Sequence, residues 1–188
     1  MKKTFKFAII GCLMLLFCII VFAPIIYVKF SFKTDYKDII STELNNTRRN
    51  SEDLNVNFVL SVIKAESGFN ANAQSQKNAF GLMQLTYLTA KDMAKSLNIE
   101  ITLNDLFNPN INIKLGICYL NFLFKQNSDK QIVLMCYNAG LNRVNSWIEN
   151  KKLQKFNGLY VCPFEETTKY VERVINNEKI YNKILGKK

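Results

Sequence analysis

The sequence predicts an all-α protein, with one globular helical domain of about 150 residues preceded by an apolar segment long enough to cross a membrane. Three observations support this prediction. Apolar residues recur with a period near 3.6 from residue 55 onward. Glycine and proline separate the periodic stretches. No run alternates apolar and polar residues over the length of a half-buried strand.

The apolar segment covers residues 7–28 and contains no charged side chain. Roughly 20 apolar residues are needed for a helix that spans a bilayer core. The three lysines that precede it favour a cytoplasmic N-terminus. A cleaved signal peptide is the alternative, but it would need a small residue at the cleavage site, where Tyr27 and Phe30 are bulky. We expect a cytoplasmic tail at 1–6 and an anchor at 7–28, in a single-pass protein of the cell membrane whose remaining chain is extracytoplasmic.

Residues 29–52 are polar and charged, except for a short amphipathic stretch around Ile40 and Leu44. We expect a tether that leads into a first helix. The main globular domain is then expected at 53–188. The chain has no internal repeat and no low-complexity tract.

The main domain is expected to begin with a helix whose apolar face carries Val59, Val62 and Ile63. Glu66 falls on the same face at the end of this helix. Gly68 follows and supplies a helix stop.

Five further helices are expected, each from an apolar stripe together with a start or stop signal. In chain order they are a helix with a stripe over 90–97, a helix that starts at Asn108-Pro109 and carries Ile111, Leu115, Cys118, Tyr119 and Phe122, a helix capped by Asp129 and broken by Gly140, a short helix around Trp147, and a last helix that Pro163 opens and that carries Tyr170, Val171, Val174, Tyr181 and Ile184.

The chain carries a formal net charge of +10 and contains no histidine. Without histidine, Ser-His-Asp and Cys-His triads are excluded, as are histidine-bound metals. A basic surface attracts polyanions, so nucleic acid and an anionic envelope or membrane surface are candidate partners, and a composition bias without any partner is the alternative. No recognised nucleic-acid motif accompanies the charge, and we expect no nucleic-acid partner.

The five cysteines include no C-x-x-C pair, so the sequence does not support a zinc or redox motif. Cys118 and Cys136 fall on apolar stripes and are expected to be small core residues. A disulfide that involves Cys162 stays open.

Glu66 is the residue whose position points to chemistry. A carboxyl group at the edge of an apolar face is partly desolvated, and desolvation raises its pKa. The acid then keeps its proton near neutral pH and can donate it to a leaving oxygen. A solvated glutamate at a helix end is the alternative.

Five short blocks follow one another from Glu66 onward. They are Glu66–Asn70, Gly81–Gln84, Asn112–Leu120, Cys136–Gly140 and Pro163–Thr167. In this order and at these separations they resemble the soluble lytic murein transglycosylase family, also called the SLT domain, of the lysozyme-like superfamily. The resemblance runs over residues 36–185. The anchored form, rich in Asn and Lys, resembles versions found in low-GC Gram-positive bacteria.

The resemblance implies a lysozyme-like helical domain with Glu66 as its catalytic residue. It also implies a set of substrate-binding residues. These are Ser75 and Gln84 at the sugar cleft, Tyr137 at the scissile region, its neighbour Asn138, and Glu166 in the last block. Thr86 stands where some members carry a cleft methionine, and we include it in this set. No metal and no organic cofactor is implied.

Three further positions depart from the family pattern. Asn78 and Asn142 stand where the family normally has glycine. Asn adopts left-handed backbone more readily than most residues, so we expect both turns to be kept. Cys136 replaces the usual alanine before Tyr137, a small change in a packed site.

The activity implied is cleavage of the β-1,4 bond between MurNAc and GlcNAc, with peptidoglycan glycan strands as the partner. Glu66 would protonate the glycosidic oxygen and then take a proton from the C6 hydroxyl of the same MurNAc, leaving a 1,6-anhydro end. One alternative is a lysozyme-type hydrolase that uses water. Another is a non-catalytic wall-binding scaffold.

Overall fold

The computed structural model describes residues 14, 16–23, 27–28 and 30–186. The chain divides into two compact units, Met1–Thr34 and Asp35–Lys188. The predicted tail at 1–6 and most of the predicted anchor at 7–28 lie outside the described residues. Among the residues that are described, no helix is both long and apolar enough to cross a membrane.

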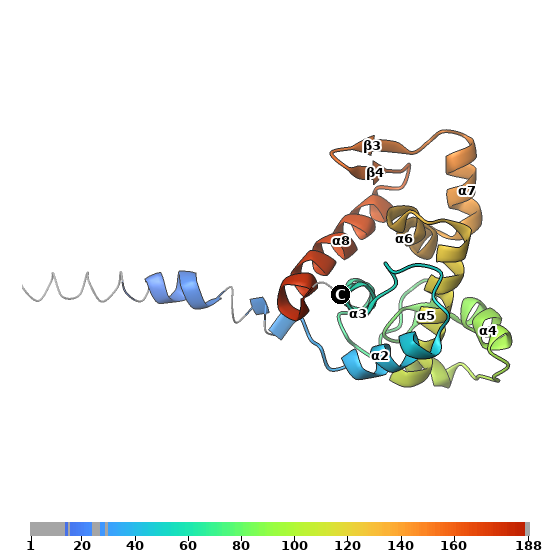
Figure 1. Cartoon of the computed structure of the whole chain (residues 1–188), viewed down its shortest axis with the longest axis horizontal. Coiled ribbons are helices and arrows are strands. Elements are labelled where there is room, and N and C mark those ends of the chain that lie inside the picture. Colours follow the sequence, from blue (N-terminus) through green and yellow to red (C-terminus); the bar gives the residue numbers. More distant parts are fainter. Residues whose placement is uncertain (1–13, 15, 24–26, 29, 187–188) are drawn as a thin grey trace, which may run out of the picture. The chain divides into compact units, whose positions relative to one another are not determined.

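The unit Asp35–Lys188 is mostly helical, which confirms the predicted class (Figure 1). Its helices are α2 (Lys37–Asn46), α3 (Val56–Ser67), α4 (Tyr87–Ser96), the 3-10 helix η1 (Asn104–Phe107), α5 (Pro109–Gln126), α6 (Lys130–Ala139), α7 (Leu141–Glu149) and α8 (Glu165–Leu185). Two antiparallel ribbons complete it. They are β1 (Ala79–Phe80) with β2 (Leu85–Thr86), and β3 (Gln154–Phe156) with β4 (Leu159–Val161).

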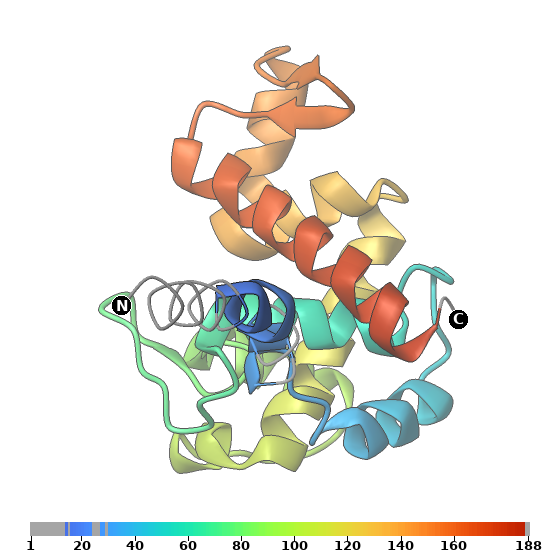
Figure 2. The same cartoon turned by 90° about the vertical axis from the view of Figure 1, so that its left-hand side faces the viewer.

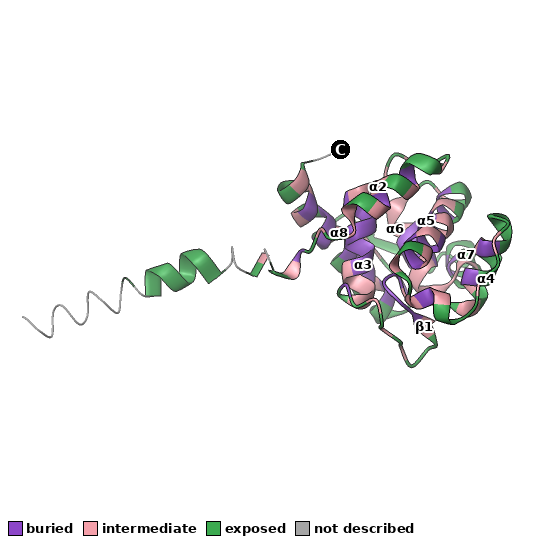
Figure 3. Ribbon diagram, turned by 90° about the horizontal axis from the view of Figure 1, so that it is seen from below, coloured by how far each residue is buried: buried purple, intermediate pink, exposed green. Residues whose placement is uncertain are grey.

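Helix α3 lies in the core of this unit, where the buried residues concentrate (Figure 3). Its fully buried apolar residues are Phe58, Val59, Leu60, Val62 and Ile63. A helix that is apolar on all sides is one that neighbours cover on all sides. The Asn55 side chain caps its start by accepting a hydrogen bond from the Phe58 amide at 3.1 Å. Gly68 ends it with a φ of 59°, a left-handed conformation that glycine adopts at little cost.

Helix α8 packs along α3 and crosses the face of the unit that Figure 2 shows. Polar contacts fix this packing, since Asn57 on α3 donates to the side-chain oxygen of Asn182 on α8 at 2.7 Å. Lys130, at the start of α6, forms ion pairs with Asp53 and with Glu178, both at 2.9 Å. The start of α3 is therefore held in a defined position relative to α6 and α8.

The two short ribbons were not predicted from the sequence. Both ribbons have strands of only two or three residues, too short to produce an alternating pattern. Asn157 and Gly158 join β3 to β4 with φ values of 48° and 81°. A type I′ hairpin turn requires positive φ at both positions, and an Asn-Gly pair is its strongest sequence signal.

Helix α5 is buried more widely than the predicted stripe suggests. Phe122, expected in the core, is 38% exposed, and Cys118 is only half-buried. The side of the helix that carries Asn112 and Gly116 is buried as well. The reason is that α2, α4 and α6 all pack against α5. These neighbours cover more of the helix surface than the single apolar stripe predicted from the sequence.

The two positions where Asn replaces glycine differ in backbone conformation, and the buried cysteines of this unit are unpaired. Asn78 has a φ of 54°, so that turn keeps its left-handed conformation. Asn142 instead lies inside α7, and the expected turn there is wrong, because the chain turns at Gly140 with a φ of 90°. Cys136 is buried as expected, and both Cys136 and Cys162 are free thiols.

Candidate active site around Glu66

Glu66 lies in the last turn of α3 and is half-buried. Burial raises the pKa of its carboxyl group from 4.5 to about 7, because the charged form loses hydration. A hydrogen bond from Tyr170 and the positive charge of Arg173 act in the opposite direction and lower the pKa. The expected desolvation of Glu66 is therefore confirmed, and the group can hold a proton at neutral pH.

Two tyrosines from different helices accompany Glu66. Burial raises the pKa of Tyr137 on α6 and of Tyr170 on α8 well above 10, and the negative charge of Glu66 raises both further. All three groups are thus close enough to interact electrostatically. The structure brings α3, α6 and α8 together at this point.

The Tyr170 hydroxyl stands out because it is buried yet poorly paired. It acts on the Glu66 carboxyl as a donor, but it makes no hydrogen bond of ordinary distance and angle with any described residue. Leaving a buried hydroxyl unpaired costs about 1–3 kcal/mol. An acceptor that came within hydrogen-bond distance of this hydroxyl would remove that cost.

The Tyr137 hydroxyl connects this group to the loop Gly81–Gln84. It donates a hydrogen bond to the Met83 carbonyl at 2.7 Å. Its ring lies 5.3 Å from the ring of Tyr119 on α5. Tyr137 is thereby fixed between Glu66 and the residue that precedes Gln84.

Asn112 on α5 holds the same loop from below. Its side-chain oxygen accepts from the Met83 amide at 2.8 Å, and its nitrogen donates to the carbonyls of Phe80 and Leu106 at 3.0 and 2.8 Å. Gly81 has a φ of 74°, and a Cβ there would collide with the Leu106 carbonyl and with Asn112 itself. The loop can therefore lie this close to α5 only with glycine at position 81.

Gln84 has left-handed backbone, with a φ of 47°. Its side-chain nitrogen donates to the carbonyls of Ala73 at 3.1 Å and Gly81 at 2.9 Å. These bonds tie the loop to the segment that follows α3. Both bonds are donated by the side-chain nitrogen of Gln84.

Ser75 and Thr86 both have local backbone partners. The Ser75 hydroxyl accepts from the Ala79 amide at 3.2 Å, in the turn that contains Asn78. Thr86 is exposed and caps α4 by accepting from the Thr89 amide at 3.2 Å. Each side chain has a structural task in addition to any contact with substrate.

Asn138 and Glu166 both meet the start of α8. The side-chain oxygen of Asn138 accepts from the Thr167 hydroxyl at 2.7 Å, which ties α6 to α8. Glu166 is exposed and forms an ion pair with Lys77 at 3.0 Å. The six expected substrate-binding residues thus fall on the segment 73–86, the end of α6 and the start of α8.

No role in the site was predicted from the sequence for four residues of this neighbourhood: Tyr170, Arg173, Asn112 and Lys77. Tyr170 was placed on an apolar stripe and treated as core, although it lies one helical turn after Glu166. Arg173 follows one turn later, with its guanidinium 5.9 Å from the ring of Tyr170. The spacing of Glu166, Tyr170 and Arg173 along one helix face is the signal that could have found them.

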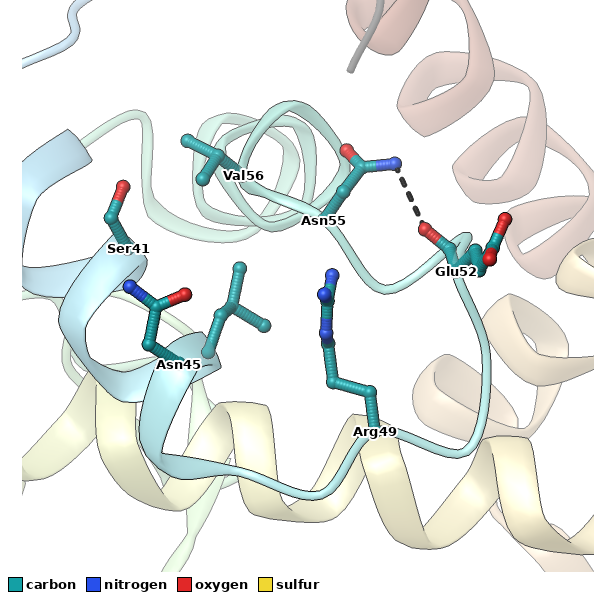
Figure 4. A pocket seen from close by; sticks show the side chains of 7 residues that line it. Ser41, Asn45, Arg49, Glu52, Asn55 and Val56 are labelled. Carbon is teal, nitrogen blue, oxygen red and sulfur yellow. Dashed lines mark hydrogen bonds between the residues drawn. The ribbon is translucent and has the colours of Figure 1, made fainter.

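A pocket that opens to solvent lies elsewhere, and Glu66 does not line it. It has a volume of about 410 Å³ and lies between α2 and the start of α3, where Arg49 points between Asn45 and Glu52 (Figure 4). Val56, at its edge, precedes Glu66 by ten residues of α3, which corresponds to about 15 Å along the helix. Arg49 also donates to the Leu54 carbonyl at 3.3 Å, so it braces the segment that enters α3.

Within the described part of the chain, no group of three or more Asp, Glu, Cys or His side chains is arranged to hold a metal ion. The strongest influences on Glu66 are burial, Tyr170 and Arg173, and none of these is a second carboxyl group. What the arrangement offers chemically is one acid that can hold a proton near neutral pH, with two phenol hydroxyls beside it.

A mostly helical lysozyme-like fold with one desolvated glutamate at the end of its central helix defines the class of this protein. Residues 43–159 match the model of the transglycosylase SLT domain, and the chain belongs to this family.

Relatives carry the same type of domain within longer chains. The soluble lytic murein transglycosylase of Salmonella typhimurium is 29% identical over 142 residues, covering 73% of this chain and 22% of that protein. The membrane-bound lytic murein transglycosylase C of Histophilus somni is 30% identical over 151 residues, covering 68% and 42%. An inactive Glu-to-Gln mutant of the lytic transglycosylase Slt from Pseudomonas aeruginosa has a TM-score of 0.70 and 28% identity, covering 82% and 25%. The chain thus spans less than half the length of each relative.

Proposed function

We propose that this chain cleaves the β-1,4 bond between MurNAc and GlcNAc in peptidoglycan as a lytic murein transglycosylase. The observation that carries the proposal is the single carboxyl group of Glu66, with a pKa of about 7 and two tyrosine hydroxyls beside it. Membership of the SLT family and the names of its relatives support the same activity.

In the first step, the protonated Glu66 donates its proton to the glycosidic oxygen. The bond from that oxygen to C1 of MurNAc breaks, and the sugar becomes oxocarbenium-like. In the second step, the Glu66 carboxylate takes the proton of the C6 hydroxyl of the same MurNAc, whose oxygen bonds to C1. An internal nucleophile has a high effective concentration, so the reaction consumes no water and needs no second carboxylate.

The other residues are proposed to position the sugar. Tyr137 and Gln84 would face the scissile region, because Tyr137 is adjacent to both Glu66 and the Met83 carbonyl. Four further residues would contact the sugars on either side. They are Ser75, Thr86, Asn138 and Glu166.

We further propose that residues 7–28 anchor the protein in the cell membrane, with the catalytic domain at 53–188 on the extracytoplasmic side. The uncharged run of this segment and the preceding lysines support this placement. A membrane-bound relative is consistent with it. An anchored enzyme of this kind would meet its substrate outside the membrane.

The test is a digestion of purified peptidoglycan with the full-length chain and with Glu66→Gln, followed by mass spectrometry of the products. We expect products with 1,6-anhydro ends, which are one water lighter than hydrolysed ends, and near-total loss of cleavage in Glu66→Gln with the fold retained. Products with only reducing ends would favour the lysozyme-type hydrolase. The absence of any product from the wild type would favour the wall-binding scaffold.

A further inference from the structure

An exposed ion pair joins the segment that follows α3 to the start of α8. The Lys77 ammonium nitrogen lies 3.0 and 3.2 Å from the two carboxylate oxygens of Glu166. Lys77 belongs to the segment between α3 and β1, whereas Glu166 is in the first turn of α8. The pair therefore connects the segment that follows Glu66 in the chain to the helix that carries Tyr170.

The position of Glu166 places this pair close to the proposed chemistry. Glu166 precedes Tyr170 by four residues on α8, so the two side chains are neighbours on one helix face, roughly 6 Å apart at Cβ. Tyr170 in turn acts on the Glu66 carboxyl group. The ion pair therefore lies one helical turn of α8 away from the tyrosine that acts on Glu66.

The pair is easily exchanged. The side chains of Lys77 and Glu166 are 79% and 70% exposed. Solvent screens exposed ion pairs and their long side chains lose entropy when they meet, so the net stabilisation is small. Helix α8 begins without a side-chain cap at Phe164, and Glu165 and Glu166 already place negative charge at its first turn. An incoming carboxylate can replace Glu166 as the partner of Lys77 at little cost.

We propose that Lys77 recognises a carboxylate carried on the lactyl arm of MurNAc, which takes the place of Glu166 as its partner. This inference rests on the proposed function. The carboxylate can come from two sources with the same chemistry: the lactyl carboxyl itself in strands without stem peptides, or a carboxyl of the stem peptide.

The experiment measures kcat and KM of the full-length chain on three kinds of glycan strand. The first carries stem peptides, the second is peptide-free with free lactyl carboxylates, and the third is peptide-free with those carboxylates converted to amides. For the wild type, we expect KM to be about fivefold higher or more on the amidated strands than on the preferred carboxylate strand, with kcat little changed. We expect Lys77→Gln to abolish this difference and Lys77→Arg to keep it.

Lys169→Gln is the matched control. Lys169 forms an equally exposed ion pair with Glu165, at 2.6 Å within α8, so its loss removes the same charge without affecting the contact to the segment after α3. The control should keep the wild-type ratio of KM values. The carboxylate strand on which Lys77→Gln loses more affinity identifies the source of the carboxylate.

Two results would overturn the inference while leaving the proposed function intact. One is cleavage by the wild type with equal KM on all three strands. The other is a Lys77→Gln variant that keeps the wild-type ratio. If the wild type cleaves none of the strands, the proposed function itself fails, and this inference fails with it.

Discussion

Replacing Tyr170 by phenylalanine removes one hydroxyl and leaves the buried ring in place. This hydroxyl is a donor that lowers the pKa of Glu66, so the pKa should rise when it is lost. A hydrogen bond to a charged group contributes about 1.5–3 kcal/mol. The lower end applies, because the Tyr170 hydroxyl lacks ordinary hydrogen-bond geometry. At about 1.4 kcal/mol per pKa unit, the expected rise is about one unit.

The assay is the pH profile of kcat/KM on peptidoglycan strands. Glu66 must be protonated in the free enzyme to act as an acid, so activity falls as pH rises through its pKa, which is about 7 in the wild type. In Tyr170→Phe we expect this basic limb near pH 8. We also expect kcat to fall about tenfold, since the same hydroxyl stabilises the Glu66 carboxylate that forms after proton donation.

Tyr181→Phe is the matched control for this change. Tyr181 is a buried tyrosine on the same helix, and Asp35 rather than Glu66 acts on its pKa. The control should leave the basic limb at its wild-type position. A basic limb that stays near 7 in Tyr170→Phe, or moves to lower pH, would refute the assignment of Tyr170 as a donor to Glu66.

Two further predictions concern stability. The folded-state pKa of Glu66 is raised from 4.5 to about 7, so the folded chain retains a proton that the unfolded chain loses. The free energy of unfolding should therefore fall as pH rises from 4.5 through 7, by about 3 kcal/mol at most and less because solvent reaches this half-buried group. Denaturant titrations at several pH values should show this fall in the wild type and not in Glu66→Gln. The same dependence of unfolding free energy on pH in both proteins would contradict the prediction. Asn112→Ala should destabilise the chain by about 3 kcal/mol and reduce cleavage, because the Met83 amide and the carbonyls of Phe80 and Leu106 lose their partner. The control is Asn110→Ala, which removes a side chain of the same kind from an exposed position on α5. Thermal unfolding should show a lower midpoint for Asn112→Ala and little change for Asn110→Ala.

The helices were predictable where local signals agree. The start of α5 at Pro109 and the end of α3 at Gly68 follow from the fixed φ of proline and the left-handed φ of glycine. Phe122 was misplaced because a sequence stripe shows only that a helix has an apolar side. How many neighbours cover the helix is decided by packing between distant segments.

The site was predictable only in part. The raised pKa of Glu66 could be expected from its place on an apolar face. The role of Asn112 could not be predicted, because its three partners lie 6 to 32 residues away in the sequence. The local sequence pattern does not indicate that these segments come close to Asn112. Tyr170 was hidden for a different reason, since a tyrosine on an apolar stripe is usually a core residue. Only the folded chain reveals that its hydroxyl faces a carboxyl group.

The place of Glu66 in the last turn of α3 has an electrostatic consequence of its own. The peptide dipoles of a helix add up to a partial negative charge at its C-terminal end, which disfavours a nearby anion by about 0.3–1 kcal/mol. This effect adds to burial and acts most strongly at the moment when Glu66 has just given up its proton. In the proposed cycle, the backbone of α3 would therefore push the carboxylate to recover a proton, and so favour closure of the anhydro ring over a long-lived charged state.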